Sequence, residues 1–204
     1  MHPRMMFDNS VASPKVDRAG ARIGRGAGAL AMGIALVISV LGCRPTIENR
    51  DPVGETFPSV RGESLDGDSV RIPDDFAGEP MVLLVGYVQK AQFDLDRWAL
   101  GILQAGLPVR VLEVPTIRGL LPGAFARTID AGMRSGIPSE DWGSVITVYG
   151  DAGKIVRATG NEGARNGRIL LLDAAGRVAW YHDRGYSAGK MLELRRAAES
   201  LVDG

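Results

Sequence analysis

The sequence predicts an α/β fold with a central mixed sheet, flanking helices and an N-terminal β-hairpin. Residues 81–88 form a continuous apolar run rich in β-branched side chains, which is typical of a buried central strand. After this run, segments of helical spacing alternate with strand-like segments, which favours a partly parallel sheet with helices on both faces. The chain then closes with two strands, 168–173 and 177–182, joined by a tight turn and followed by a helix.

The hairpin is the first element expected in chain order. An Asp-Gly turn at 66–67 precedes residues 69–72, which alternate as a strand does. A helix is expected over 94–105 because apolar side chains recur there on one face, and Gly106 ends it as a C′ glycine would. The other expected elements are strands at 109–114 and 144–149, helices at 120–133 and 188–202, and a short helix or loop at 152–158. We expect residues 82–87 to lie beside residues 109–114 in the sheet.

Cys43 is the only cysteine of the chain, and it follows an uncharged run at 27–42. As a helix this run would span about 24 Å, less than the roughly 30 Å of bilayer hydrocarbon, which is typical of a signal peptide. The tetrad at 40–43, Val-Leu-Gly-Cys, resembles the bacterial lipoprotein signal. The resemblance implies cleavage after Gly42 and a covalent lipid on Cys43. The alternative is an uncleaved signal anchor with an incidental cysteine.

We therefore divide the chain into three parts. Residues 1–43 are a lipoprotein signal peptide ending at the acylated cysteine, residues 44–54 a flexible tether, and residues 55–204 one domain. The tether is polar, contains two prolines and lacks periodicity. With either interpretation of Cys43, we expect the domain on the extracytoplasmic face of a bacterial membrane, inner or outer.

The charge balance bears on partners and cofactors. Five of the 24 basic and two of the 24 acidic residues precede Cys43, so residues 43–204 carry a net charge of −3. No basic patch with interleaved aromatic side chains is present, so we expect no nucleic-acid partner. His182 is the only histidine after Cys43, and no spacing typical of a zinc site occurs. We expect no metal, and no cofactor apart from the lipid.

Two stretches resemble a known superfamily: residues 57–67, which end in Leu-Asp-Gly, and residues 77–84, Ala-Gly-Glu-Pro-Met-Val-Leu-Leu. They are similar to the opening of the peroxiredoxin and thioredoxin-like superfamily, and the resemblance implies a thioredoxin-like fold. The superfamily's catalytic cysteine would lie within 88–94, but this chain has Val-Gln-Lys-Ala-Gln-Phe-Asp there. The superfamily's cis-proline is also missing before Arg168. Because thiol chemistry needs a thiolate, these departures indicate a thioredoxin-like protein without redox activity.

Several later segments are similar to the mitochondrial ATP synthase assembly-factor family, which is itself thioredoxin-like. They are residues 113–115, 133–138, 166–173 and 176–180. This resemblance implies a non-catalytic assembly or chaperone role at a membrane. It does not imply that family's own client.

Three groups of polar residues are candidate binding residues. The first lies at the start of the helix after residue 88, where the superfamily meets its substrates: Gln92, Asp94, Asp96 and Arg97. Asp94 also suits an N-cap or first-turn position, where a carboxylate favours the helix dipole.

The second and third groups lie on loops expected near the same rim. The second group could recognise a carboxylate or phosphate, or could order a loop through an ion pair: Glu113, Thr116, Arg118 and Arg134. The third group, Asn166 and Arg168, occupies the loop in which the superfamily has its cis-proline. These residues could hydrogen-bond an extended peptide, although turn formation alone also explains an asparagine there.

The missing thiol favours a binding protein over an enzyme. We expect a non-catalytic protein that binds another envelope or membrane protein or assists its assembly. The alternative is a module that binds a small molecule or peptide at the rim formed by Glu113, Arg118 and Arg134. A third possibility is a cysteine-free enzyme with a catalytic acid or base at Asp94, Asp96 or Glu113.

Overall fold

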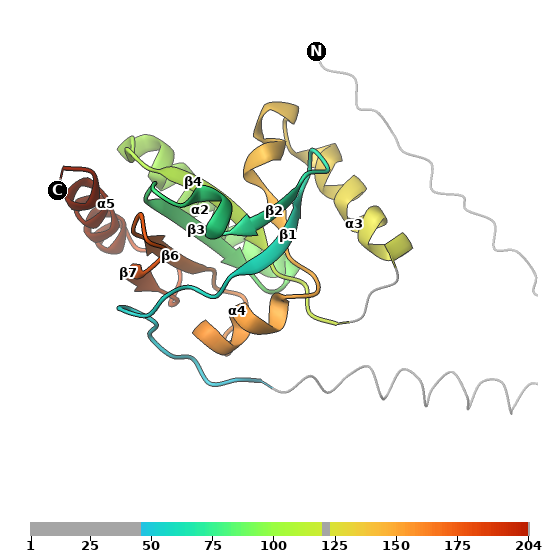
Figure 1. Cartoon of the computed structure of the whole chain (residues 1–204), viewed down its shortest axis with the longest axis horizontal. Helices are drawn as coiled ribbons and strands as arrows, with labels where there is room; N and C mark the ends of the chain where they lie inside the picture. Colours follow the sequence, from blue (N-terminus) through green and yellow to red (C-terminus); the bar gives the residue numbers. More distant parts are fainter. Residues whose placement is uncertain (1–45, 120–122, 204) are drawn as a thin grey trace, which may run out of the picture. The chain divides into compact units, whose positions relative to one another are not determined.

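A computed structural model of the chain describes residues 46–119 and 123–203 (Figure 1). The predicted signal peptide, Cys43 and the predicted helix start at Leu120 lie outside these residues. Within the described part, no helix is long and apolar enough to cross a membrane.

Four strands form the central sheet of the described chain, in the order β4-β3-β6-β7 (Figure 1). Their bounds are Met81–Gly86 for β3, Arg110–Pro115 for β4, Arg168–Leu172 for β6 and Val178–His182 for β7. β3 runs parallel to β4, with Val82 opposite Val111, and antiparallel to β6, with Leu83 opposite Leu170. This confirms the predicted pairing of residues 82–87 with residues 109–114, and the mixed sheet is as the sequence predicts.

The predicted N-terminal hairpin forms the larger part of a second, smaller sheet. β1 (Val60–Ser64) pairs with β2 (Ser69–Ile72), and Gly67 has the positive φ that the tight turn requires. β5 (Ile146–Thr147) pairs antiparallel with β1. Gly62 permits this approach, because a Cβ there would lie 2.6 Å from Cγ2 of Ile146.

The strand predicted over 144–149 is therefore much shorter than expected. Residues 139–144 form a 3-10 helix, η3 (Ser139–Ser144), and β5 joins β1 rather than the central sheet. Single parallel bridges, such as Thr116 with Val148, link this segment to β4 and its continuation.

Helices cover the faces of the central sheet (Figure 1). Their bounds are Gln92–Ala105 for α2, Gly123–Gly136 for α3, Ala152–Thr159 for α4 and Ala188–Asp203 for α5. On one face α2 and α5 pack together over Val82 and Leu84 of β3, and on the other Leu83 and Val85 join a core shared with β1 and α4. This alternation of side chains along β3 buries both faces, which explains its unbroken apolar run.

Candidate functional site

The junction between β3 and α2 carries no thiol. Tyr87 follows β3, a 3-10 turn η2 (Gln89–Ala91) comes next, and α2 begins at Gln92. Two apolar side chains are exposed at this junction, Phe93 by 71% and Val88 by 45%. At the position where the resemblance would place a catalytic cysteine, the surface therefore presents apolar side chains.

Asp94 closes this junction from the inside. Its side chain is buried, and its two carboxylate oxygens accept hydrogen bonds from the backbone N–H groups of Gly167 (2.9 Å) and Tyr186 (2.7 Å). Asp94 lies in the first turn of α2, as predicted, but it does not cap the helix, since Ala91 holds the N-cap position. Charge-assisted bonds of this kind are strong, so Asp94 ties α2 to the loops before β6 and α5.

Glu113 lies together with two of the predicted helix-start residues. Gln92 donates a hydrogen bond through Nε2 to Oδ1 of Asp96 at 2.9 Å, and its amide also lies close to the Glu113 carboxyl. Burial raises the pKa of Glu113, and the negative charge of Asp96 raises it further, while the Gln92 amide opposes both. Glu113 is half-buried and Asp96 is exposed, so this cluster faces solvent along the start of α2.

Arg134 does not join this cluster. Its Nε donates to the Leu65 carbonyl at 2.6 Å, and its guanidinium lies 5.8 Å from the centre of the Trp142 ring. No ion pair joins Arg134 to Glu113 among the described residues. Arg134 therefore fixes α3 to the β1–β2 turn. It makes no ion pair with Glu113 in the described residues, so it does not join the rim predicted there.

The other predicted residues of these two groups have separate positions. Thr116 is buried, and its hydroxyl donates to the Val114 carbonyl at 3.1 Å, which is a structural role. Arg118 lies close enough to Tyr87 for its charge to favour the ionised phenol. Arg97 is exposed on α2.

Arg168 is the most unusual of the predicted residues because its side chain is fully buried without an ion-pair partner in the described chain. Nη1 donates to the Asn166 carbonyl at 2.9 Å, and Nη2 donates to the Glu162 carbonyl and to Oδ1 of Asn49 at 2.9 Å. The guanidinium lies 5.4 Å from the centre of the Tyr87 ring, and its Nε has no hydrogen-bond partner. Carbonyl dipoles and an aromatic face thus replace the carboxylate that a buried arginine usually has.

Asn49 belongs to a segment that we call the strap (Thr46–Gly54). The sequence predicts a flexible tether over 44–54, but the strap is hydrogen-bonded to the rest of the domain. Ile47 and Asn161 exchange two hydrogen bonds, of 2.6 and 2.9 Å, and the N–H of Gly54 donates to the Val178 carbonyl at 2.8 Å. Periodicity could not indicate this, because polar contacts and not apolar burial hold the strap.

Asn49 is the central contact of the strap. Its Oδ1 accepts from Arg168, while its Nδ2 donates to Oδ2 of Asp183 at 2.8 Å and to the Glu162 carbonyl at 3.2 Å. Asn166, the neighbour predicted with Arg168, donates through Nδ2 to the Asp183 carbonyl at 3.4 Å. A polar cluster therefore forms where the loop before β6 meets the end of β7.

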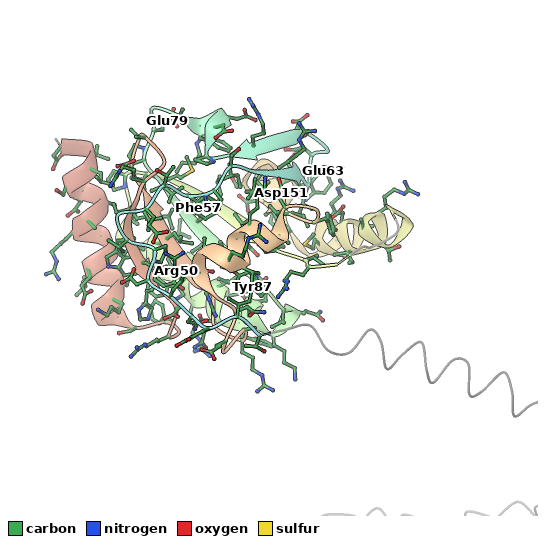
Figure 2. The ribbon with its side chains drawn as sticks, turned by 60° about the horizontal axis from the view of Figure 1, so that its bottom comes forward. Arg50, Phe57, Glu63, Glu79, Tyr87 and Asp151 are labelled. Carbon is green, nitrogen blue, oxygen red and sulfur yellow. The ribbon has the colours of Figure 1, made fainter. Side chains whose placement is uncertain are left out.

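Two tyrosines complete this cluster, and sequence reasoning did not single them out. The Tyr87 hydroxyl lies 2.6 Å from the Thr159 hydroxyl, and the Tyr181 hydroxyl donates to the Thr159 carbonyl at 3.3 Å. Burial raises the pKa of Tyr87 to about 12 and also raises that of Tyr181, so both phenols are neutral at pH 7. The N–H of Arg50 in the strap also donates to the Thr159 carbonyl, and Figure 2 shows Arg50 and Tyr87 on the same side of the domain.

The site contains hydrogen-bonding groups but no constellation that the chemistry of metals or thiols would need. Within the described residues, no group of three or more His, Cys, Asp or Glu side chains is placed to hold a metal ion. The arrangement can bind: it offers exposed apolar side chains at the start of α2 and, beneath the strap, a buried cation separated from the Asp183 carboxylate by the Asn49 amide.

No protein-family model matches the chain, and no curated protein sequence matches it. Several solved structures are similar to the chain. A SCO1/SenC family lipoprotein from Bacillus anthracis str. Ames is 12% identical, with 76% of this chain and 99% of that chain covered and a TM-score of 0.51. BsSco, a member of the Sco family of cytochrome c oxidase assembly proteins, is 12% identical with the same coverage and a TM-score of 0.50. The exposed lipoprotein thioredoxin Etrx1 of Streptococcus pneumoniae strain TIGR4 is 16% identical, covering 68% of this chain and 98% of that one, with a TM-score of 0.45.

The likeness to the two Sco structures shows that the fold is thioredoxin-like, and it confirms the predicted fold class. At these identities the likeness concerns the fold alone, because one fold hosts many functions.

Proposed function

We propose that the chain is a lipid-anchored, non-redox thioredoxin-like protein of the bacterial envelope, which binds another envelope or membrane protein or assists its assembly. One observation carries the proposal: the β3–α2 junction has Asp94 turned inward and Phe93 turned outward, with no thiol in the described residues. A surface of this kind can hold a partner, but it cannot exchange disulfides.

Two further points support the proposal. The structural neighbours include a lipoprotein and a member of a family of assembly proteins, which are roles that this fold takes in other chains. Cys43 ends an apolar run in the sequence, as a lipidated cysteine does. Stable anchoring requires more than one acyl chain, which the modification of a lipoprotein cysteine supplies.

The test is crosslinking in membranes followed by co-purification of three tagged proteins: wild type, Cys43→Ser and Phe93→Ser. We expect specific membrane-protein subunits with the wild type, their loss with Cys43→Ser, and reduced recovery with Phe93→Ser while that variant stays membrane-bound. Recovery of nothing above background from a membrane-bound wild type would contradict the proposal. The alternative, a small-molecule or peptide binding module, would then take its place, and it would have to use the polar cluster around Arg168 instead of a rim including Arg134.

A further inference from the structure

The guanidinium of Arg168 has one hydrogen-bond donor, Nε, that has no acceptor. In an arginine, Nε and Nη2 share the edge that receives a planar partner side-on. Here Nη2 donates to Oδ1 of Asn49 at 2.9 Å and to the Glu162 carbonyl, whereas Nε is buried with no partner. A buried polar group without a partner has a free-energy cost, so the edge has capacity that Asn49 does not exhaust.

The opposite side of the Asn49 amide meets acceptors. Its Nδ2 donates to Oδ2 of Asp183 at 2.8 Å and to the Glu162 carbonyl at 3.2 Å. The space that the side chain occupies is therefore lined by donors on one side and by acceptors on the other. A group that fits must accept on one atom and donate from its neighbour, and a primary carboxamide does both.

A carboxylate fits the same space less well. One of its oxygens would pair with Arg168, but the other would face Oδ2 of Asp183 and the Glu162 carbonyl, which repel it. The lining thus selects an uncharged amide over an acid of the same shape.

The strap that brings Asn49 to this place is held mainly by polar contacts. Of its nine residues only Pro52 is buried. Single hydrogen bonds contribute about 0.5–1.5 kcal/mol each after exchange with water, so a segment held in this way can open locally without unfolding the core.

We propose that the space between Arg168 and Asp183 is a carboxamide-binding site, which Asn49 of the chain itself fills in this structure and which the Asn or Gln side chain of a partner polypeptide fills when the strap moves away. The part concerning a partner rests on the proposed function; the site itself does not. Binding a partner there requires release of the strap, so strap and partner compete for one site.

The test uses the full chain with Asn49→Ala, which empties the site and keeps Arg168 and Asp183. Thermal unfolding is followed with acetamide as the probe and with sodium acetate as the matched control, at constant ionic strength. We expect acetamide to raise the Tm of Asn49→Ala in a saturable manner, by about 2 °C near saturation, acetate to raise it less, and neither to shift the wild type. The double variant with Asp183→Ala should lose the preference for acetamide.

Equal shifts with acetamide and acetate, or no shift with either, would overturn the inference. If Asn49→Ala does not fold, Asn49→Ser carries the same test, because its hydroxyl keeps an acceptor for Nη2. Co-purification separates this inference from the proposed function. Failure to capture any partner with the wild type counts against the proposed function and leaves the acetamide result standing. Capture that does not rise with Asn49→Ala counts against competition between strap and partner.

Discussion

Oδ2 of Asp94 accepts a hydrogen bond of 2.9 Å from the backbone N–H of Gly167, across 73 residues of sequence. Gly167 immediately precedes β6, and a Cβ at this position would lie 2.3 Å from Cδ2 of Leu95. The glycine thus lets the loop approach the start of α2 closely enough for the carboxylate to reach it. This bond holds the start of α2 to the loop before β6.

Asp94→Ala should therefore destabilise the domain strongly. It leaves two backbone N–H groups, of Gly167 and Tyr186, without their acceptor. Hydrogen bonds to charged groups contribute about 1.5–3 kcal/mol each, so we expect a loss of roughly 3 kcal/mol or more in chemical denaturation. Asp96→Ala, an exposed change on the same helix, should stay within about 0.5 kcal/mol. Similar losses in the two variants would contradict the role given to Asp94.

Gly160 tests the docking of the strap. Its φ is +72°, and a Cβ there would lie 2.3 Å from the Glu48 carbonyl oxygen and 2.4 Å from the Asn49 Cα. We expect Gly160→Ala to push the strap away, so that trypsin cleaves after Arg50 faster than in the wild type while the core remains folded. Gly163→Ala is the control: its φ is +57°, but a Cβ would meet nothing within 4 Å. Unchanged cleavage in Gly160→Ala would show that the strap does not depend on this contact.

How much of the structure the sequence predicts depends on how far apart along the chain the interacting residues lie. β3 and β6 were predictable because strands buried on both faces need apolar side chains at nearly every position, and this leaves a local pattern. The strap has no such pattern. Its bond from Ile47 to Asn161 joins residues 114 positions apart, and a polar segment looks the same in sequence whether it is docked or free.

The candidate residues divide in the same way. The sequence places Asp94 in the first turn of α2, but its acceptor role depends on loops that no local rule brings there. Arg168 was selected as a loop residue, and its full burial follows from Asn49 and Tyr87, which lie far from it in sequence. Arg134 was grouped with Glu113 because their loops were expected to lie close together, whereas in the structure Arg134 contacts Leu65 and Trp142.

Phe93 tests whether the exposed start of α2 binds a partner. Because the side chain is 71% exposed, Phe93→Ser should change the free energy of unfolding by less than about 0.5 kcal/mol. It should nevertheless reduce crosslinked partner recovered from membranes, since exposed aromatic side chains are frequent energetic centres of interfaces. Leu103→Ser, 77% exposed near the other end of α2, is the matched change. Equal recovery with the wild type and with both variants would remove the start of α2 from the interface.

Glu113 gives the domain a pH dependence with a defined sign. Burial raises the pKa of its carboxyl above the ordinary value of 4.5, and the charge of Asp96 adds to the effect. A carboxyl whose pKa is higher in the folded than in the unfolded state favours folding when protonated. That contribution is complete below about pH 4.5 and disappears as the pH rises through the folded-state pKa.

Glu113→Gln removes this titration and keeps an acceptor for Gln92. We therefore expect the variant to have a higher Tm than the wild type at pH 7 and a similar Tm at pH 4, measured by thermal unfolding across this range. Glu193→Gln should behave in the opposite way. The hydrogen bond from Lys190 lowers the pKa of Glu193, so its loss should slightly reduce the Tm at pH 7, and this difference should disappear as the pH falls from 4.5 through the lowered folded-state pKa. A Glu113→Gln variant that is no more stable than the wild type at pH 7 would show that its neighbours fully compensate the buried charge.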